Sequence, residues 1–227
     1  MLTTVARIAG GLLRAGIALI LLVRRPRPIH ARGTVLEGDL RWLPRARQTG
    51  IAWIDAPVAG TVVPVAARVS RGVGLPSWLP DVYGLALRTE SSEGPADLEL
   101  SSSGIGVPGR FLLVPHRSAL RGTLGTLLPY EGTRGPLMVC ARTTVGPASG
   151  SAEEASPTEP WRLRLYAAAP AGRWHPFADL TLRRGAAKDD ASLRFDAVRH
   201  PLPGAGTYEW TRALRQPSYH LAQRRSE

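Results

Sequence analysis

The sequence offers little sulfur or amide chemistry for a binding site. Cys140 is the only cysteine, and asparagine is absent from all 227 residues. A single cysteine excludes an intrachain disulfide and a zinc site built from several cysteines. A reducing compartment fits this composition, so we expect a cytoplasmic protein.

Lysine is nearly absent too, although the chain is strongly basic. Lys188 is the only lysine, so arginine supplies almost all of the positive charge behind the formal net charge of +11. Abundant arginine, alanine, glycine and proline are typical of a GC-rich bacterial coding sequence. No basic run is interleaved with aromatic side chains, as a stacking platform for nucleic acid requires. The sequence therefore favours no nucleic-acid partner.

An apolar segment occupies residues 1–23, and three arginines follow it within residues 24–27. A cleaved secretion signal would carry its positive charge before the apolar run. A bilayer span is opposed by Arg14, which would lie mid-membrane at a cost of about 3 kcal/mol. We expect a helix over residues 1–26. It would pack on the domain or on a partner subunit, lie on the inner membrane face through residues 1–25, or span the bilayer.

Beyond residue 26, short β-branched and apolar runs alternate with turns rich in glycine, proline and serine. This spacing predicts an α+β fold: an antiparallel β-barrel of about eight strands with flanking N- and C-terminal helices. We expect one domain over residues 27–227, with a polar surface loop at 146–160 and a C-terminal helix at 205–226 that contains Pro217. The candidate strands are residues 34–42, 50–54, 61–69, 82–89, 96–101, 137–144, 161–168, 177–183 and 193–195.

Generic catalytic motifs are absent from the sequence. It has no P-loop, no nucleophile elbow and no HExxH pair, and its five histidines are too scattered to specify a metal site. A longer ordered pattern is present instead. It consists of RPIHARG at 27–33, ARVS at 67–70, DVYGLAL at 81–87, ADL at 96–98 followed by SSS at 101–103, and RQPSY at 215–219.

These segments, in this order, resemble the core of the catalase superfamily, in the form of a short catalase-related haem protein. In that family an Arg-x-x-His-Ala-x-Gly segment carries the distal histidine, and an arginine stands four residues before the proximal tyrosine. The resemblance covers most of residues 27–103 and 193–225. It implies a catalase-like barrel that binds haem b.

On the proximal side, the resemblance makes Tyr219 the iron ligand and Arg215 the cation beside it. Free tyrosine has a pKa of about 10, so the site must stabilise the phenolate. A guanidinium one helical turn away does so. Arg27 and Arg68 resemble the family's propionate-binding arginines, which suits the bidentate geometry of the guanidinium.

On the distal side, the resemblance makes His30 the acid–base group. A neutral imidazole can take a proton from one peroxide oxygen and return it to the other. Ser70 resembles the serine that orients this histidine through its second ring nitrogen. Ser101 is the nearest equivalent of the family's distal asparagine, which this chain lacks.

The same residues also have ordinary structural interpretations. His30 alone would be a loop histidine, Arg68 an arginine that points outward at the end of the barrel, and Tyr219 a helix tyrosine packed on the core. Cys140 lies in an apolar run, which predicts a small core residue and not a thiolate ligand.

The missing asparagine and the short chain argue against efficient dismutation of hydrogen peroxide. A more open pocket favours a haem-dependent peroxidase or peroxygenase acting on organic or lipid hydroperoxides. The alternatives are a non-catalytic haem sensor or carrier, and a haem-free barrel that serves as a membrane-associated binding module. The expected partners are haem, a small peroxide substrate and a second copy of the chain in a homo-oligomer.

Overall fold

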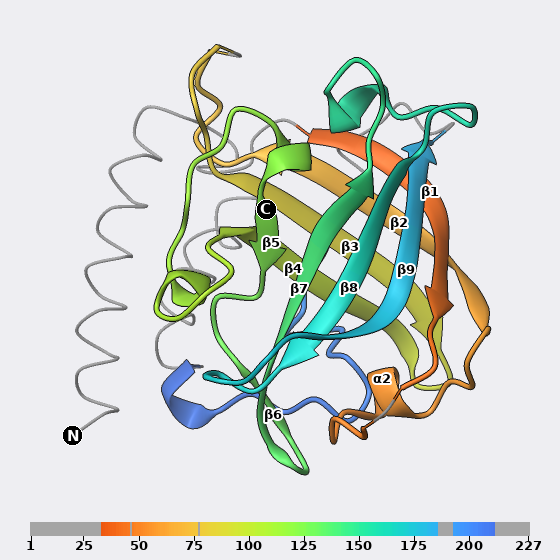
Figure 1. Cartoon of the computed structure of the whole chain (residues 1–227). Coiled ribbons are helices and arrows are strands. Elements are labelled where there is room, and N and C mark those ends of the chain that lie inside the picture. Colours follow the sequence, from red (N-terminus) through yellow and green to blue (C-terminus); the bar gives the residue numbers. More distant parts are fainter. Residues whose placement is uncertain (1–32, 46, 77, 186–192, 212–227) are drawn as a thin grey trace, which may run out of the picture.

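The computed structural model describes residues 33–45, 47–76, 78–185 and 193–211 (Figure 1). Within them, eight antiparallel strands close into a barrel in the order β5–β4–β3–β2–β1–β9–β8–β7, because β7 pairs back onto β5. The predicted antiparallel barrel is thus confirmed. The strands are β1 (Gly33–Trp42), β2 (Val62–Arg71), β3 (Tyr83–Ser91), β4 (Gly94–Ser103), β5 (Thr123–Gly125), β7 (Gly135–Val145), β8 (Trp161–Ala168) and β9 (His175–Arg184), and a further short strand, β6 (Tyr130–Gly132), pairs with β7.

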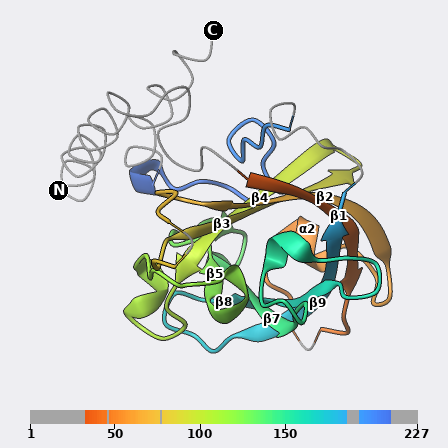
Figure 2. The same ribbon diagram turned by 90° about the horizontal axis from the view of Figure 1, so that it is seen from above.

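Alternating burial explains why these segments form barrel strands. In β1, Leu36, Leu40 and Trp42 are buried, whereas Glu37 and Asp39 between them are exposed. Successive side chains of a strand point to opposite faces, so the apolar set fills the interior. Figure 2 shows β1–β4 and β7–β9 on opposite sides of that interior. The wall therefore has a packed inner face and a separate outer face.

The prediction of a strand at residues 50–54 is wrong. This segment forms a short helix, α2 (Ala52–Asp55), and its Trp53 is buried. The indole nitrogen of Trp53 donates to the Thr89 hydroxyl oxygen at 3.0 Å, and its ring meets Trp42 and Phe177 edge-on. The helix fills one end of the barrel instead of extending its wall.

Three smaller features also differ from the sequence prediction. Residues 193–195 form no strand, and residues 205–208 are not helical; helical backbone is present at 209–211. The predicted helix beyond residue 211 lies outside the described residues. Neither β5 nor β6 was predicted, because three residues are too few to show a periodic pattern.

The connection between β7 and β8 holds residues 146–160. It contains a 3₁₀ turn at Ala152–Glu154, whose Ala152 is fully buried. The segment therefore contacts the barrel through small apolar side chains although its sequence is polar.

None of the helices among the described residues could serve as a membrane-spanning segment, because each is too short or too polar. The apolar segment 1–26 lies outside the described residues.

Candidate functional site

The outer face of β2 carries two of the predicted site residues. Val65, Ala67 and Val69 are buried in the core, so Arg68 and Ser70 point to the opposite side of the strand. Both are nevertheless buried, with 8% and 5% of their surface exposed. Side chains on the outer wall of a barrel are usually exposed to solvent. The burial of Arg68 and Ser70 therefore shows that this part of the outer wall is shielded from solvent.

Strand register places Ser101 on the same face. Gly33, Ser70, Gly84 and Ser101 pair in one continuous row across β1, β2, β3 and β4. Ser70 and Ser101 flank Gly84 from its two sides, so their Cα atoms lie about 10 Å apart, which is twice the strand spacing.

The neighbouring row contains Val35, Arg68, Ala86 and Glu99. The structure thus brings Arg68, Ser70 and Ser101 onto one surface. The other predicted site residues lie outside the described residues: Arg27, His30, Arg215 and Tyr219.

A third row of the same face holds an ion pair that the sequence analysis missed. Arg88 of β3 and Asp97 of β4 are direct cross-strand partners. The guanidinium donates from Nε to Oδ1 of Asp97 at 2.7 Å and from Nη2 to Oδ2 at 2.6 Å. The Asp97 side chain is completely buried, and the Arg88 side chain is 21% exposed, so this is a strong pair with its carboxylate removed from water.

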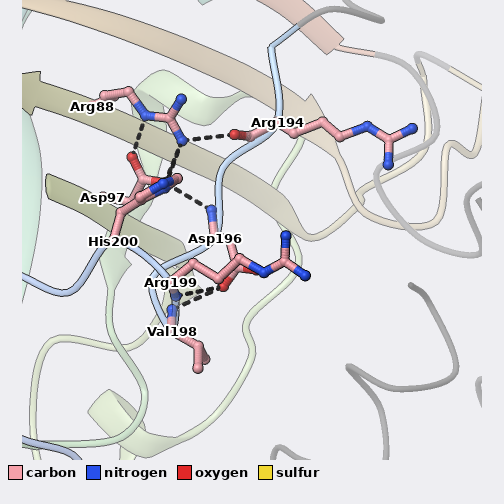
Figure 3. Close-up of polar contacts among 7 residues, drawn as sticks. All are labelled: Arg88, Asp97, Arg194, Asp196, Val198, Arg199 and His200. Atoms are coloured by element: carbon pink, nitrogen blue, oxygen red, sulfur yellow. Dashed lines mark hydrogen bonds and ion pairs between the residues drawn. The ribbon is translucent and has the colours of Figure 1, made fainter. Parts of the chain in front are cut away.

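The same pair binds a distant segment of the chain (Figure 3). The Asp196 amide donates to Oδ2 of Asp97 at 2.7 Å, and Nδ1 of His200 lies 3.1 Å from the same oxygen. Arg88 also donates to the Arg194 carbonyl oxygen at 2.7 Å. Residues 194–200 are therefore fastened to the outer wall, and Figure 2 shows the blue C-terminal segment on that side of β1–β4.

The contacts of Asp97 stabilise its charged form. Burial raises its pKa, but Arg88, the Asp196 amide and His200 together bring the pKa below its ordinary value of 3.8. Among the side chains it meets, only Arg88 could have been suggested from the sequence, by its place in the adjacent strand. His200 is 103 residues away from Asp97, so no local pattern could reveal it.

Asp81 has a similar structural role in the β2–β3 connection. Its buried carboxylate accepts hydrogen bonds from the amides of Val73, Gly74, Leu75 and Val82 at 2.7–3.0 Å. Burial raises the pKa of this carboxyl, but the four amide donors lower it to below 3.8 overall. Asp81 thus fixes the loop that leads into β3.

Cys140 is buried in β7, as predicted for a core residue. Burial raises the pKa of its thiol to about 12, so it stays neutral and is a poor metal ligand. Within the described part of the chain, no three histidine, cysteine or acidic side chains are grouped to hold a metal ion.

No protein-family model matches the chain, and no curated protein matches its sequence. Solved catalase structures do match its fold. They include a bacterial catalase with a TM-score of 0.58 at 14% identity, a fungal catalase with 0.56 at 12%, and catalase A from Saccharomyces cerevisiae with 0.61 at 11%. The chain has a catalase-like fold. Each match covers 92% of this chain but only 59%, 63% and 62% of the respective catalase chains.

The catalase-like barrel gathers the internal motif segments in adjacent strands. Residues 67–70 lie in β2, residues 81–87 lead into β3, and residues 96–103 lie in β4. Two motif aspartates in these segments, Asp81 and Asp97, hold the loop at 73–75 and the segment at 194–200. Much of the recognisable pattern therefore serves to build the barrel wall and to hold the loop and the segment that pack against it.

The outer face of the catalase-like barrel fits the needs of a haem group in two respects. The row of Gly33, Ser70, Gly84 and Ser101 contains only small residues, so a planar ring could approach the strand backbone closely there. A Cβ atom at Gly33 would lie 2.7 Å from the guanidinium carbon of Arg68. The cation therefore lies across Gly33, in a buried setting that suits pairing with a carboxylate.

Proposed function

We propose that this catalase-like protein binds haem b against the outer face of β2–β4 and reduces organic or lipid hydroperoxides. The observation that carries the proposal is the shared face of Arg68, Ser70 and Ser101 on a catalase-like barrel. These residues come from separate segments of the sequence pattern, and strand register alone aligns them. The same pattern supplies His30 and Tyr219 in the expected order.

Arg68, with Arg27, would bind the haem propionates. A buried guanidinium can donate two parallel hydrogen bonds to one carboxylate, which fixes both position and orientation. Tyr219 would be the axial ligand. Arg215, four residues earlier, would hold the phenolate in its charged form and thereby favour ferric iron.

His30 would move the proton of the substrate. In the peroxidase reaction the O–O bond breaks, and the hydroperoxide takes two electrons from an organic reductant and two protons to give an alcohol and water. When bound, haem would supply the redox chemistry for this reaction. His30 would take the proton from the terminal oxygen of the hydroperoxide and return it to the oxygen bonded to carbon, which leaves as the alcohol. Ser70 would hold the His30 ring in one tautomer.

Ser101 distinguishes this site from that of an efficient catalase. Its side chain is shorter than asparagine and reaches less far from the β4 backbone, which leaves more room above the ring. A larger hydroperoxide would fit, whereas hydrogen peroxide would be held less firmly. A peroxygenase reaction, in which the oxygen goes to an organic acceptor, is compatible with the same site.

Absorption spectra of the full chain with added ferric haem test the proposal. We expect a Soret band of ferric tyrosinate haem that is lost or strongly shifted in Tyr219→Phe. Tyr166→Phe, a tyrosine of β8 on the opposite wall, is the matched control and keeps the wild-type spectrum. Wild type without a specific band, or Tyr219→Phe with an unchanged one, would overturn the proposal.

Turnover is tested separately on His30→Ala. With an organic hydroperoxide and an organic electron donor, its rate should fall by about 100-fold or more while the Soret band remains. Equal rates in His30→Ala and wild type would favour a haem sensor or carrier. A chain that stays free of haem after reconstitution would favour a barrel without a cofactor.

A further inference from the structure

Exposed apolar side chains are concentrated on two loops of the barrel. One loop joins β2 to β3 (residues 72–76 and 78–82), and the other joins β4 to β5 (residues 104–122). Of the twelve exposed large apolar side chains in the described residues, eight lie in these two loops. Trp78 is 71% exposed, and Val107 and Leu112 are each 57% exposed.

The two loops form one connected surface. The Asp81 amide donates to the His116 carbonyl oxygen, and the His116 amide donates back to the Asp81 carbonyl oxygen, both at 2.8 Å. The two views agree that both loops lie on the same side of the barrel, at the left in Figure 1 and in Figure 2. A single flat target could therefore contact both loops.

Buried charged groups hold both loops in place. The Asp81 carboxylate binds the amides at 73–75, and Arg71 donates to the Leu79 carbonyl oxygen at 2.8 Å. In the second loop, the buried Arg110 stacks over Trp174 and donates to the carbonyl oxygens of Ala169 and Gly172. These contacts fix the backbone of both loops, while their apolar side chains remain exposed to solvent. Exposed apolar side chains on a fixed backbone are typical of a binding surface.

Within the two loops themselves, the exposed charge has one sign. Arg117 and Arg121 are exposed in the β4–β5 loop, which contains no acidic residue. The only acid in either loop is Asp81, whose carboxylate is buried and fully engaged. Exposed tryptophan, leucine and valine in loops that also carry arginines suit a lipid surface, which has apolar acyl chains beneath anionic headgroups.

We infer that these two loops dock the barrel onto an anionic lipid surface. Trp78, Val107 and Leu112 enter the boundary between headgroups and acyl chains, and Arg117 and Arg121 contact lipid phosphates. The inference concerns these two loops and not residues 1–25, and it does not depend on haem binding.

Vesicle sedimentation of the full chain tests the inference. Wild type should bind vesicles of phosphatidylcholine and phosphatidylglycerol more tightly than phosphatidylcholine alone. Leu112→Glu should weaken binding by about tenfold, and Arg117→Gln by about fivefold on the anionic vesicles only. Val145→Glu, an exposed valine in β7 outside the two loops, is the matched control and binds like wild type.

Fluorescence quenching by brominated lipids reports on this surface even if residues 1–25 also bind the vesicle. The quenched component should disappear in Trp78→Phe, since Trp78 is a highly exposed indole of the β2–β3 loop. Unchanged quenching in Trp78→Phe, or equal vesicle binding by Leu112→Glu and wild type, would overturn the inference. A third result would also overturn it: wild type associates with itself in solution and does not bind vesicles, and Leu112→Glu abolishes that self-association. The loops would then be an interface between copies of the chain.

Discussion

Two arginine–aspartate pairs on the barrel wall have nearly the same geometry in different surroundings. Arg88 and Asp97 are directly opposed on β3 and β4, and Arg164 and Asp179 are directly opposed on β8 and β9. Both pairs have Nε–Oδ1 distances of 2.7 Å. The side chain of Asp97 is fully buried, whereas 37% of the Asp179 side chain is exposed. The two pairs therefore compare a buried carboxylate that also binds residues 196 and 200 with a more exposed one at the same Nε–Oδ1 distance.

Asp97→Asn should lower the free energy of unfolding by about 3 kcal/mol, because the substitution leaves the largely buried Arg88 cation without its counter-charge. Asp179→Asn removes the same charge from an exposed pair and should cost less than about 1 kcal/mol. Urea unfolding of the two variants beside wild type measures both values. Equal losses in the two variants would contradict the idea that burial sets the strength of the Arg88–Asp97 pair.

Acid should destabilise the barrel partly through Asp97. Its pKa is lower in the folded chain than its ordinary value of 3.8, so the unfolded chain binds the proton more tightly. This contribution to stability is complete above about pH 5 and is lost as the pH falls through 3.8 and below. Urea titrations between about pH 6 and pH 3 should show a steep decline for wild type and a shallower one for Asp97→Asn. A decline of equal slope would mean that other carboxyls, such as Asp81, account for the acid sensitivity.

At the scale of single elements, β1 depends on a glycine where it pairs with β9. Gly38 is opposite Leu182, and a Cβ atom at position 38 would collide with the backbone carbonyl of Thr181. A backbone group cannot turn aside as a long side chain can. Close approach of this kind lets a barrel strand bend sharply.

Gly38→Ala should therefore loosen the β1–β9 pairing and lower the unfolding free energy by about 2 kcal/mol or more. Gly106→Ala is the matched control, since a Cβ atom at that position meets nothing within 4 Å. Thermal unfolding followed by circular dichroism measures the difference. A Gly38→Ala variant that melts with the Gly106→Ala control would show that the wall can relax around the added methyl group.

The elements also show how far sequence patterns reach. Strands with strict alternation, such as β1 and β8, could be predicted because one face is buried and the other is not. Residues 50–54 misled the prediction because isoleucine and tryptophan favour strands, whereas the open end of the barrel required a short helix with Trp53 buried. The shared face of Arg68 and Ser70 follows from their spacing of two. The contact of Asp97 with His200 cannot be predicted in this way, because it depends on where residues 194–200 pack against the outer wall of the barrel.

At the scale of the molecule, the order of segments and the closed register act together. The motif segments of β2, β3 and β4 are consecutive in the chain and adjacent in the wall, and Gly33 pairs with Ser70 where β1 joins them. Arg88 and Asp97 then bind residues 194–200 to the same outer face. A cofactor on this face would contact several separate parts of the chain, and so would stabilise the fold as a whole.

Ferric haem should accordingly raise the melting temperature of the full chain. A ligand that binds only the folded state adds about 2.7 kcal/mol at 100 times its Kd. Arg68→Gln removes the proposed propionate partner, a charged hydrogen-bond donor, and should weaken haem binding by about tenfold at equal haem concentration. Arg164→Gln, on the exposed pair of the opposite wall, should keep the full increase. Differential scanning calorimetry with and without haem measures these shifts. A wild-type increase that Arg68→Gln retains would place the haem away from β2, because a propionate bound to Arg68 cannot lose that cation without losing affinity.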